Sequence, residues 1–149
     1  MEIALSVFFF IVLIIFILII CLLIKMTSKG PIIFWSKRIG RNKKFFMMPK
    51  FRTMLMDTPN LATHLLEFPE KYMTPIGRFL RRTSLDELPQ LISIIKGEMT
   101  FVGPRPALFN QSDLIAMRDE LNIFDLKPGV TGWAQIKGRD KISLEEKVK

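Results

Sequence analysis

The sequence is poor in the two residues that most often build disulfides and transition-metal centres. Its 149 residues include one cysteine, Cys21, and one histidine, His64. A single cysteine excludes an intramolecular disulfide and any site that needs several cysteine ligands. A lone histidine is most often an ordinary surface or packing residue. Disulfides and cysteine-based metal sites are therefore excluded. The length allows one compact domain plus an appendage.

Residues 3–24 lack charge, proline and glycine. Residues 3–24 form an unbroken apolar run in which Ser6 carries the only hydroxyl group. As a helix these 22 residues reach about 33 Å, which matches a hydrocarbon core of about 30 Å. A secretory signal peptide would need a basic amino end, a shorter apolar core and a small-residue cleavage site. We therefore expect a retained membrane helix over residues 1–25.

Acidic residues are missing from residues 25–52, a segment that holds nine lysines and arginines. All 22 basic residues follow the apolar run, and the formal net charge is +8. By the positive-inside rule, the segment after the helix is cytoplasmic, and its charge attracts anionic lipid. We expect residues 26–149 to form a small membrane-associated cytoplasmic domain.

The elements expected in this domain are short. Two extended segments on either side of a basic turn predict a β-hairpin close to the bilayer, and Pro49 restricts the second strand to a sheet edge. Apolar periodicity and capping residues predict amphipathic helices. The helices are expected at residues 60–68, from Pro75, from Ser84 to Gly97, from Ser112 to about Phe124 and at 143–149, with extended segments at 100–103 and 130–136. The predicted fold class is α+β, mainly helical.

Two adjacent carboxylates, Asp86 and Glu87, stand out in this basic chain. Ser84 and Glu87 have the S-x-x-E spacing of a capping box, which predicts a helix that begins at Ser84. Both carboxylates then lie in a first helical turn, where free amides favour anions, including phosphate. Capping is the commonest role of such residues. An ionised aspartate there can also attack phosphorus, and a neighbouring glutamate can help hold Mg²⁺.

Basic residues lie on both sides of the acidic pair. Arg81 and Arg82 precede it, and Arg105 follows it between two prolines, Pro104 and Pro106. The prolines restrict the backbone around Arg105 and so direct one guanidinium group. Arginine binds phosphate through two parallel hydrogen bonds, so this arrangement is suited to phosphate substrates.

Several segments, taken in order, resemble the bacterial sugar transferase family, the monotopic phosphoglycosyl transferases that begin lipid-linked glycan synthesis. They read GPIIF with RIG, KFRTM, LRRTSLDELPQL, KGEM, FVGPRP and KPGVTGWAQ. Each segment alone is modest evidence for the family. The segments in this order are highly specific for it, and together they cover about residues 30–139.

The resemblance implies transfer of a sugar-1-phosphate from a UDP-sugar to polyprenyl (undecaprenyl) phosphate in two steps. Asp86 matches the family's nucleophile, which takes the phosphosugar and releases UMP. Glu87 matches the acidic partner that is associated with Mg²⁺, with Asp86 beside it. Lys50, Arg81 and Arg105 match basic positions near substrate phosphates. The implied product feeds capsule, exopolysaccharide, O-antigen or glycoprotein glycan synthesis.

The implied setting is the bacterial inner (cytoplasmic) membrane, with the catalytic domain facing the cytoplasm. The lipid bilayer and downstream glycosyltransferases are the implied partners. Nucleic acid is not expected as a partner, because no recognised binding motif is present.

The sequence departs from the family pattern at two places. Family members commonly break the membrane helix with a Ser-Pro pair, which makes it re-entrant. The apolar run here has neither proline nor glycine, so re-entrant and spanning helices are both open. Family chains also continue beyond the Gly138-Arg139 turn, so the domain over residues 26–149 is expected to lack that C-terminal extension. The alternative function is an inactive membrane-anchored basic module that binds anionic lipid or a partner protein.

Overall fold

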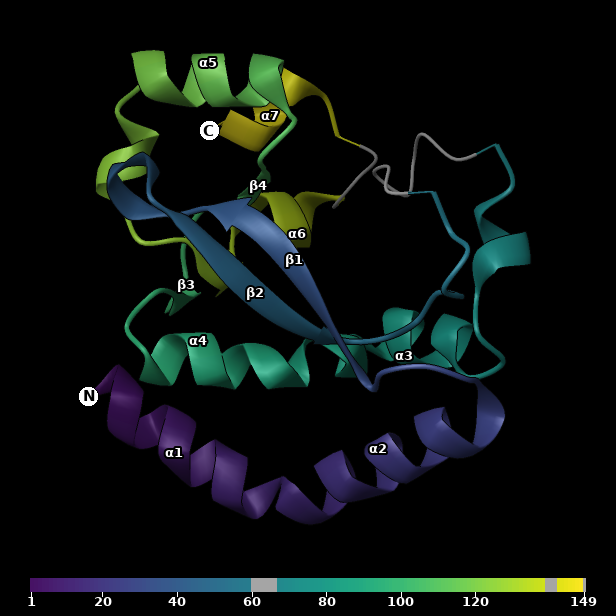
Figure 1. Cartoon of the computed structure of the whole chain (residues 1–149). Coiled ribbons are helices and arrows are strands. Elements are labelled where there is room, and N and C mark those ends of the chain that lie inside the picture. Colours follow the sequence, from purple (N-terminus) through teal and green to yellow (C-terminus); the bar gives the residue numbers. More distant parts are fainter. Residues whose placement is uncertain (60–66, 139–141, 149) are drawn as a thin grey trace.

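The structure is a computed structural model that describes residues 1–59, 67–138 and 142–148. Figure 1 shows a twisted β-hairpin above a layer of short helices, with the two amino-terminal helices beneath that layer. The helices are α1 (Glu2–Val12), α2 (Ile14–Thr27), α3 (Gly77–Thr83), α4 (Leu91–Ile95), α5 (Ser112–Glu120), α6 (Trp133–Lys137) and α7 (Leu144–Val148). The strands are β1 (Ile33–Ile39), β2 (Phe45–Phe51), β3 (Thr100–Val102), β4 (Ala107–Leu108) and β5 (Gly129–Thr131). The 3₁₀ helices are η1 (Arg41–Lys43), η3 (Pro69–Tyr72), η4 (Leu85–Gln90) and η5 (Ile123–Asp125).

The predicted hairpin is confirmed. Strands β1 and β2 pair antiparallel, from Ile33 opposite Phe51 to Ile39 opposite Phe45. Strand β4 pairs with the other side of β1, so β2 is an edge strand, as Pro49 requires. A second, parallel pair joins β3 and β5. The mixture of helices and strands agrees with the α+β prediction.

The hairpin rests on two apolar clusters. Phe46 and Met48 of β2 pack with Leu91, Ile94 and Met99 from the α4 region. At the far end of the same strand, a second cluster joins the hairpin to α2 and α3. Its buried members are Ile20, Ile24, Phe51 and Leu80. Both ends of β2 are thereby fixed against helices.

The apolar run forms two helices instead of one. No helix among the described residues is by itself long and apolar enough to cross a membrane. Taken together, α1 and α2 meet this criterion by length and composition, but they are bent by 60° at their junction. The junction is Leu13, whose φ of −91° and ψ of 2° depart from helical values. The bend needs no proline, because both halves pack against the domain. Ile24 of α2 lies in the second cluster, and Phe10 of α1 packs against the first.

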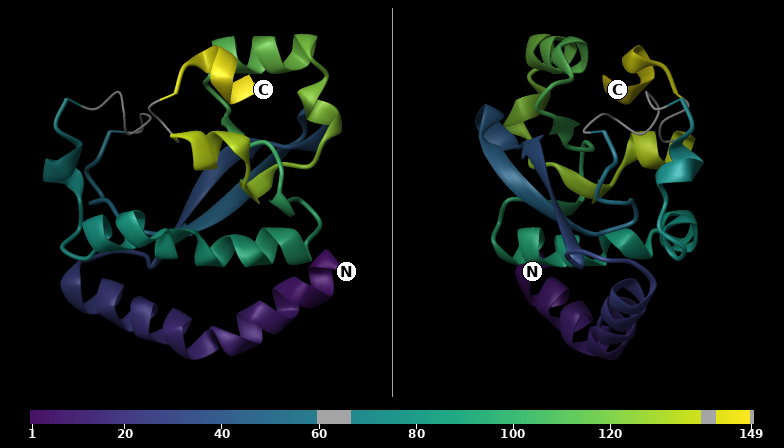
Figure 2. Two further views of the ribbon diagram at one scale, coloured as in Figure 1. Left: turned by 180° about the vertical axis from the view of Figure 1, so that it is seen from behind. Right: turned by 45° about the vertical axis from the view of Figure 1, so that its right-hand side comes forward.

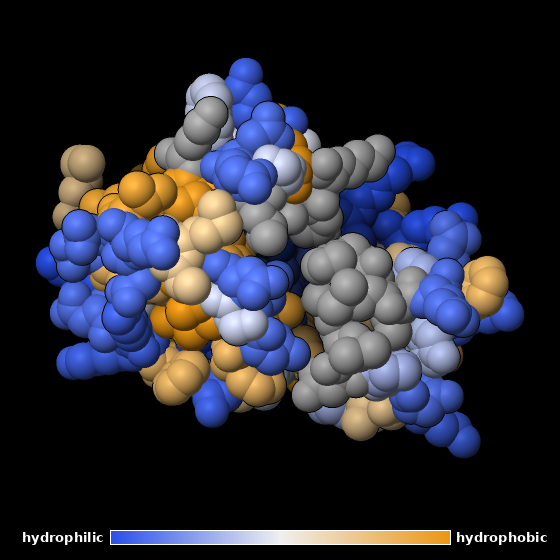
Figure 3. All heavy atoms as spheres, turned by 90° about the horizontal axis from the view of Figure 1, so that it is seen from above, coloured by the Kyte–Doolittle hydropathy of each residue, from blue (hydrophilic) through white to orange (hydrophobic). Residues whose placement is uncertain are grey.

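The amino-terminal helix pair is the most apolar part of the surface among the described residues. The face seen from above carries hydrophilic side chains around much of its rim, with hydrophobic side chains exposed between them on the left of the view (Figure 3). The opposite side carries α1 and α2 (Figure 2). Many of their large apolar side chains are exposed, among them Phe8, Ile11, Ile15, Phe16 and Leu22. The helix pair therefore gives the molecule an apolar underside.

Several predicted boundaries differ from the structure. Helix α3 begins at Gly77, two residues after Pro75, and α5 ends at Glu120. The predicted extended segment at residues 130–136 is wrong beyond Thr131, because α6 begins at Trp133. The helix predicted at residues 60–68 falls almost entirely outside the described residues. The helix expected at residues 143–149 is confirmed as α7.

Glycine permits the close approach of β3 and β5. A Cβ atom built on Gly129 would lie 2.1 Å from the backbone nitrogen of Gly103. One built on Gly132 would lie 2.1 Å from the Gly103 carbonyl oxygen. Because these neighbours are backbone atoms, a side chain at either position would push the strands apart.

We predict that Gly129→Ala lowers the free energy of unfolding by about 2 kcal/mol or more, because the new methyl group overlaps backbone atoms. Urea or thermal unfolding in detergent micelles measures the loss. Gly40→Ala is the matched control, since its Cβ would meet the Phe46 ring at 3.1 Å and a side chain can yield more easily. Equal losses in both variants would contradict the interlocked-backbone explanation.

Candidate active site

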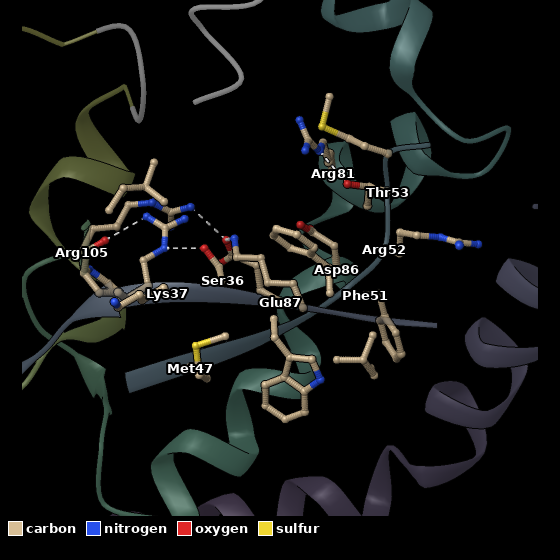
Figure 4. A pocket seen from close by; sticks show the side chains of 18 of the residues that line it. Ser36, Lys37, Met47, Phe51, Arg52, Thr53, Arg81, Asp86, Glu87 and Arg105 are labelled. Atoms are coloured by element: carbon tan, nitrogen blue, oxygen red, sulfur yellow. Dashed lines mark hydrogen bonds and ion pairs between the residues drawn. The ribbon is translucent and has the colours of Figure 1, made fainter. Parts of the chain in front are cut away.

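The predicted site residues meet in one cavity of about 1020 Å³. It lies between the hairpin, η4 and the segment that follows β3 (Figure 4). All five site residues predicted from the sequence line it: Lys50, Arg81, Asp86, Glu87 and Arg105. The prediction that they form one site is therefore consistent with the structure, although they come from four separate parts of the chain.

Glu87 is held by two cations. Its Oε1 atom accepts a hydrogen bond from Lys50 Nζ at 2.6 Å and one from an Arg105 guanidinium nitrogen at 3.1 Å. The Glu87 side chain is 17% exposed and that of Lys50 is 15% exposed. Burial by itself would raise the pKa of the Glu87 carboxyl, but Lys50 and Arg105 outweigh it and lower this pKa to about 2. Glu87 is thus a fixed negative charge that orients two cations.

This arrangement corrects the capping-box prediction. Ser84 lies at the junction of α3 and η4 with a left-handed φ of 59°, and among the described residues it makes no side-chain capping bond to η4. The Glu87 carboxylate points to Lys50 and Arg105 instead of back to the Ser84 amide. Two charged donors compete for a carboxylate more strongly than one neutral amide does. Asp86 and Glu87 nevertheless lie in the first turn of η4, as predicted.

Asp86 has the opposite electrostatic character. Asp86 is 7% exposed. This burial raises the pKa of its carboxyl, and Lys50 is the charge that lowers this pKa most. Glu87 raises it further, whereas Arg81 lowers it. Adjacent carboxylates whose pKa values are driven apart commonly have different roles in a site. Here Glu87 is suited to hold cations and Asp86 to react.

Arg81 is positioned by a residue that the sequence analysis did not single out. Its Nε atom donates a hydrogen bond to Oγ1 of the buried Thr53, at 2.8 Å (Figure 4). Thr53 follows β2 closely, so the strand that carries Lys50 also orients Arg81 from α3. Thr53 belongs to the KFRTM segment, which was a signal available in the sequence.

Three further arginines line the cavity and were also missed: Arg38, Arg52 and Arg118. Arg38 donates to the Pro106 carbonyl at 3.1 Å, and Arg118 donates to the Arg105 carbonyl at 2.6 Å. Arg38 belongs to the RIG segment. Arg118 lies on α5 outside every segment singled out above, so the sequence contained no comparable signal for it.

The site offers two carboxylates to a metal ion. Groups of three or more histidine, cysteine or acidic side chains that could hold a metal do not occur in the part of the chain that the structure describes. Mg²⁺ at phosphate-transfer sites commonly takes one or two carboxylates, and substrate phosphates and water complete its shell. Both carboxylates of the pair line the cavity, and the cations contact one Glu87 oxygen, Oε1. The residues therefore fit a magnesium ion that is completed by substrate.

Comparison with known proteins agrees with this site. A family model described as "Bacterial sugar transferase" matches residues 1–149. The chain belongs to the bacterial sugar transferase family. An undecaprenyl-phosphate glucose phosphotransferase of Komagataeibacter xylinus is 39% identical over 139 residues, which cover 89% of this chain and 26% of that protein.

Other relatives carry similar names. The UDP-glucose:undecaprenyl-phosphate glucose-1-phosphate transferase of Escherichia coli (strain K12) is 41% identical over 122 residues, covering 80% of this chain and 26% of that protein. The exopolysaccharide production protein ExoY of Rhizobium meliloti is 35% identical over 147 residues, covering 87% of this chain and 64% of that protein. The chain thus spans about a quarter of the first two relatives and under two thirds of the third.

The low pKa of Glu87 makes a prediction about stability. The folded-state pKa of about 2 lies below the ordinary value of 4.5. Ionised Glu87 therefore stabilises the fold above about pH 4.5, and this contribution is lost as the pH falls toward 2. We expect Glu87→Gln to destabilise the protein near pH 6 by up to about 3 kcal/mol, and the difference from wild type to shrink by pH 3.

Thermal unfolding in detergent at several pH values measures this difference. Glu70→Gln is the control, because Glu70 pairs with Arg78 on the surface and exposed pairs contribute little. A difference between wild type and Glu87→Gln that stays constant from pH 6 to pH 3 would show that the Glu87 charge does not stabilise the fold.

Proposed function

We propose that this chain is a phosphoglycosyl transferase that moves a sugar-1-phosphate from a UDP-sugar to undecaprenyl phosphate. The observation that carries the proposal is the buried Asp86 in a cavity lined by Lys50, Arg81 and Arg105. Two phosphate-bearing substrates need such a cationic cavity. The names of the relatives, undecaprenyl-phosphate glucose phosphotransferase among them, support the same reaction class.

In the first proposed step, an Asp86 carboxylate oxygen attacks the phosphorus that carries the sugar. An Asp–O–P bond forms, the pyrophosphate P–O bond breaks, and UMP leaves with the electron pair. The raised pKa of Asp86 favours this role, since a more basic carboxylate is a better nucleophile once ionised. In the second step, an oxygen of undecaprenyl phosphate attacks the same phosphorus, which forms the lipid diphosphate sugar and restores the Asp86 carboxylate.

The basic residues would neutralise the charge that develops on the phosphates. Arg81 and Lys50 are the cations that act on the Asp86 carboxyl, and we assign them to the transferred phosphoryl group. Arg105, on the other side of Glu87, would bind the nucleotide phosphate. Mg²⁺, held by Glu87 and Asp86, would supply further charge stabilisation at the phosphate oxygens.

We also propose that the α1–α2 pair enters the membrane as a re-entrant unit, with the domain at the cytoplasmic face of the inner membrane. The amino end returns to the domain: the Thr100 hydroxyl donates a hydrogen bond to the Glu2 carboxylate, and the Phe9 and Phe101 rings meet edge to face, 6.3 Å apart. Both ends of the pair would then lie on one side of the bilayer. In this arrangement the cavity would face a lipid substrate whose prenyl chain lies in the membrane.

We predict that Asp86→Asn lowers UMP release by at least about 1,000-fold, because it removes the nucleophile and leaves a similar shape. The assay incubates membranes with undecaprenyl phosphate and a panel of UDP-sugars, and it measures UMP together with lipid-linked sugar. Asp119→Asn, which alters a surface carboxylate paired with Lys43, is the control and should stay fully active.

Full activity of a folded Asp86→Asn protein would refute the covalent mechanism. If the wild type releases no UMP and instead binds anionic vesicles equally well with and without the two carboxylates, the chain is a membrane-anchored basic module. A single-turnover experiment with a sugar-labelled donor adds a direct test. Label should remain on the wild-type protein in the absence of acceptor and should be absent from Asp86→Asn.

The re-entrant arrangement predicts that the amino end and the hairpin tip react from the same side. One cysteine is placed before Met1 or, in a second variant, introduced as Lys44→Cys, both in a Cys21→Ser background. A membrane-impermeant maleimide should label both variants in inverted inner-membrane vesicles and neither in right-side-out vesicles. Labelling of the amino-terminal cysteine from the outside would instead establish a spanning helix.

A further inference from the structure

The segment that carries Arg105 is held in an unusual way. Residues 104–106 include two prolines, which lack an N–H group, so most of its backbone anchoring must come through carbonyl oxygens. Its three consecutive carbonyls accept hydrogen bonds from three different elements. The first accepts from the Gly129 N–H of β5 at 3.0 Å, the second from Arg118 of α5 at 2.6 Å, and the third from Arg38 of β1 at 3.1 Å.

The middle bond adds to the restraint that the two prolines place on the backbone around Arg105. Proline sets φ at residues 104 and 106, and the residue before a proline is restricted to extended conformations. The direction of the Arg105 carbonyl depends on ψ at Arg105. Because the Arg118 guanidinium donates a hydrogen bond to this carbonyl oxygen, it restricts that angle as well. The next carbonyl is bound by Arg38, whose Nε also donates to Ser36 Oγ at 3.0 Å. The guanidinium plane of Arg38 is thereby fixed as well.

The position of Arg118 is unfavourable for a charged side chain. The residue is 3% exposed, and burial lowers the pKa of its guanidinium to about 10. A buried arginine that served only to fill space could be replaced by an apolar side chain at a gain in stability. Its contact with the backbone of Arg105 suggests a different use, because the Arg105 side chain reaches Glu87 from that point.

We propose that Arg118 and Arg38 are positioning residues that hold the Arg105 guanidinium against Glu87 and toward the substrate phosphates. They act through the carbonyls of residues 105 and 106 and not by contact with the substrate. The proposal rests on the transferase function proposed above for its kinetic test, but its structural test is independent of activity.

The structural test follows the Arg105 guanidinium ¹⁵N resonance in arginine-labelled protein, assigned as the signal lost in Arg105→Lys. We expect Arg118→Met and Arg38→Met to move this resonance toward its position in Glu87→Gln, in which the anchoring charge is removed. Asp119→Asn, next to Arg118 on α5, should leave it unchanged. A resonance that stays in place in a folded Arg118→Met or Arg38→Met protein would overturn the proposal for that residue. If Arg118→Met fails to fold, Arg38→Met still decides whether the carbonyls position Arg105.

The kinetic test is a double-mutant cycle on UMP release. We expect Arg118→Met to lower kcat/KM by about 10- to 100-fold in the wild-type background, the size of effect that a small displacement of a catalytic group causes. In an Arg105→Met background the same change should cost less than about 3-fold, because the group it positions is gone. Equal losses in both backgrounds would assign Arg118 a purely structural role. If wild-type protein shows no UMP release while the resonance moves as expected, the proposed function fails and the positioning role stands.

Discussion

The Lys50–Glu87 ion pair is the interaction on which the rest of the site depends. It joins the hairpin to η4, and each partner is largely buried. Removing two charges from water is costly, and the pair is favourable only if its geometry is held and further hydrogen bonds are made. The fold meets both conditions: Pro49 and Phe51 on either side of Lys50 are buried, and Arg105 provides a second donor to Glu87. The pair thereby joins the strand that carries Lys50 to the helix that carries Asp86, at the cavity that both line.

The chain contains the S-x-x-E pattern twice, and the two copies fold differently. At Ser143 and Glu146, the Glu146 N–H lies 3.3 Å from the serine oxygen, and the Glu146 carboxylate accepts from the Ser143 N–H. This is a capping box on an exposed helix end. At Ser84 the same pattern lies next to Lys50, and the glutamate turns to the cation. The local pattern specifies a possible bond, and the charges that the fold brings near it decide which bond forms.

What the sequence could predict followed from local signals. Alternating extended segments and Pro49 indicated the hairpin and its edge, and the residues of the site lay in motifs that resemble one family. The bend at Leu13 could not be predicted, because it comes from the packing of both helices on the domain. Helix α6 was missed because Gly132 and the β-favouring residues around it resemble a strand. Arg118 was missed because the group it binds, the Arg105 carbonyl, is a backbone oxygen 13 residues away.

The opposite pKa shifts of the two carboxylates are consistent with different roles for the two members of the acidic pair in the proposed mechanism. A single buried aspartate among several cations would be drawn into an ion pair, and its pKa would fall, as that of Glu87 does. Glu87 takes the two nearest donors, Lys50 and Arg105, onto one oxygen atom. Asp86 is left buried with a raised pKa. In the proposed mechanism, a carboxylate that is not paired with a cationic side chain stays basic enough to attack phosphorus, and its neighbour keeps the cations in place to receive the phosphate.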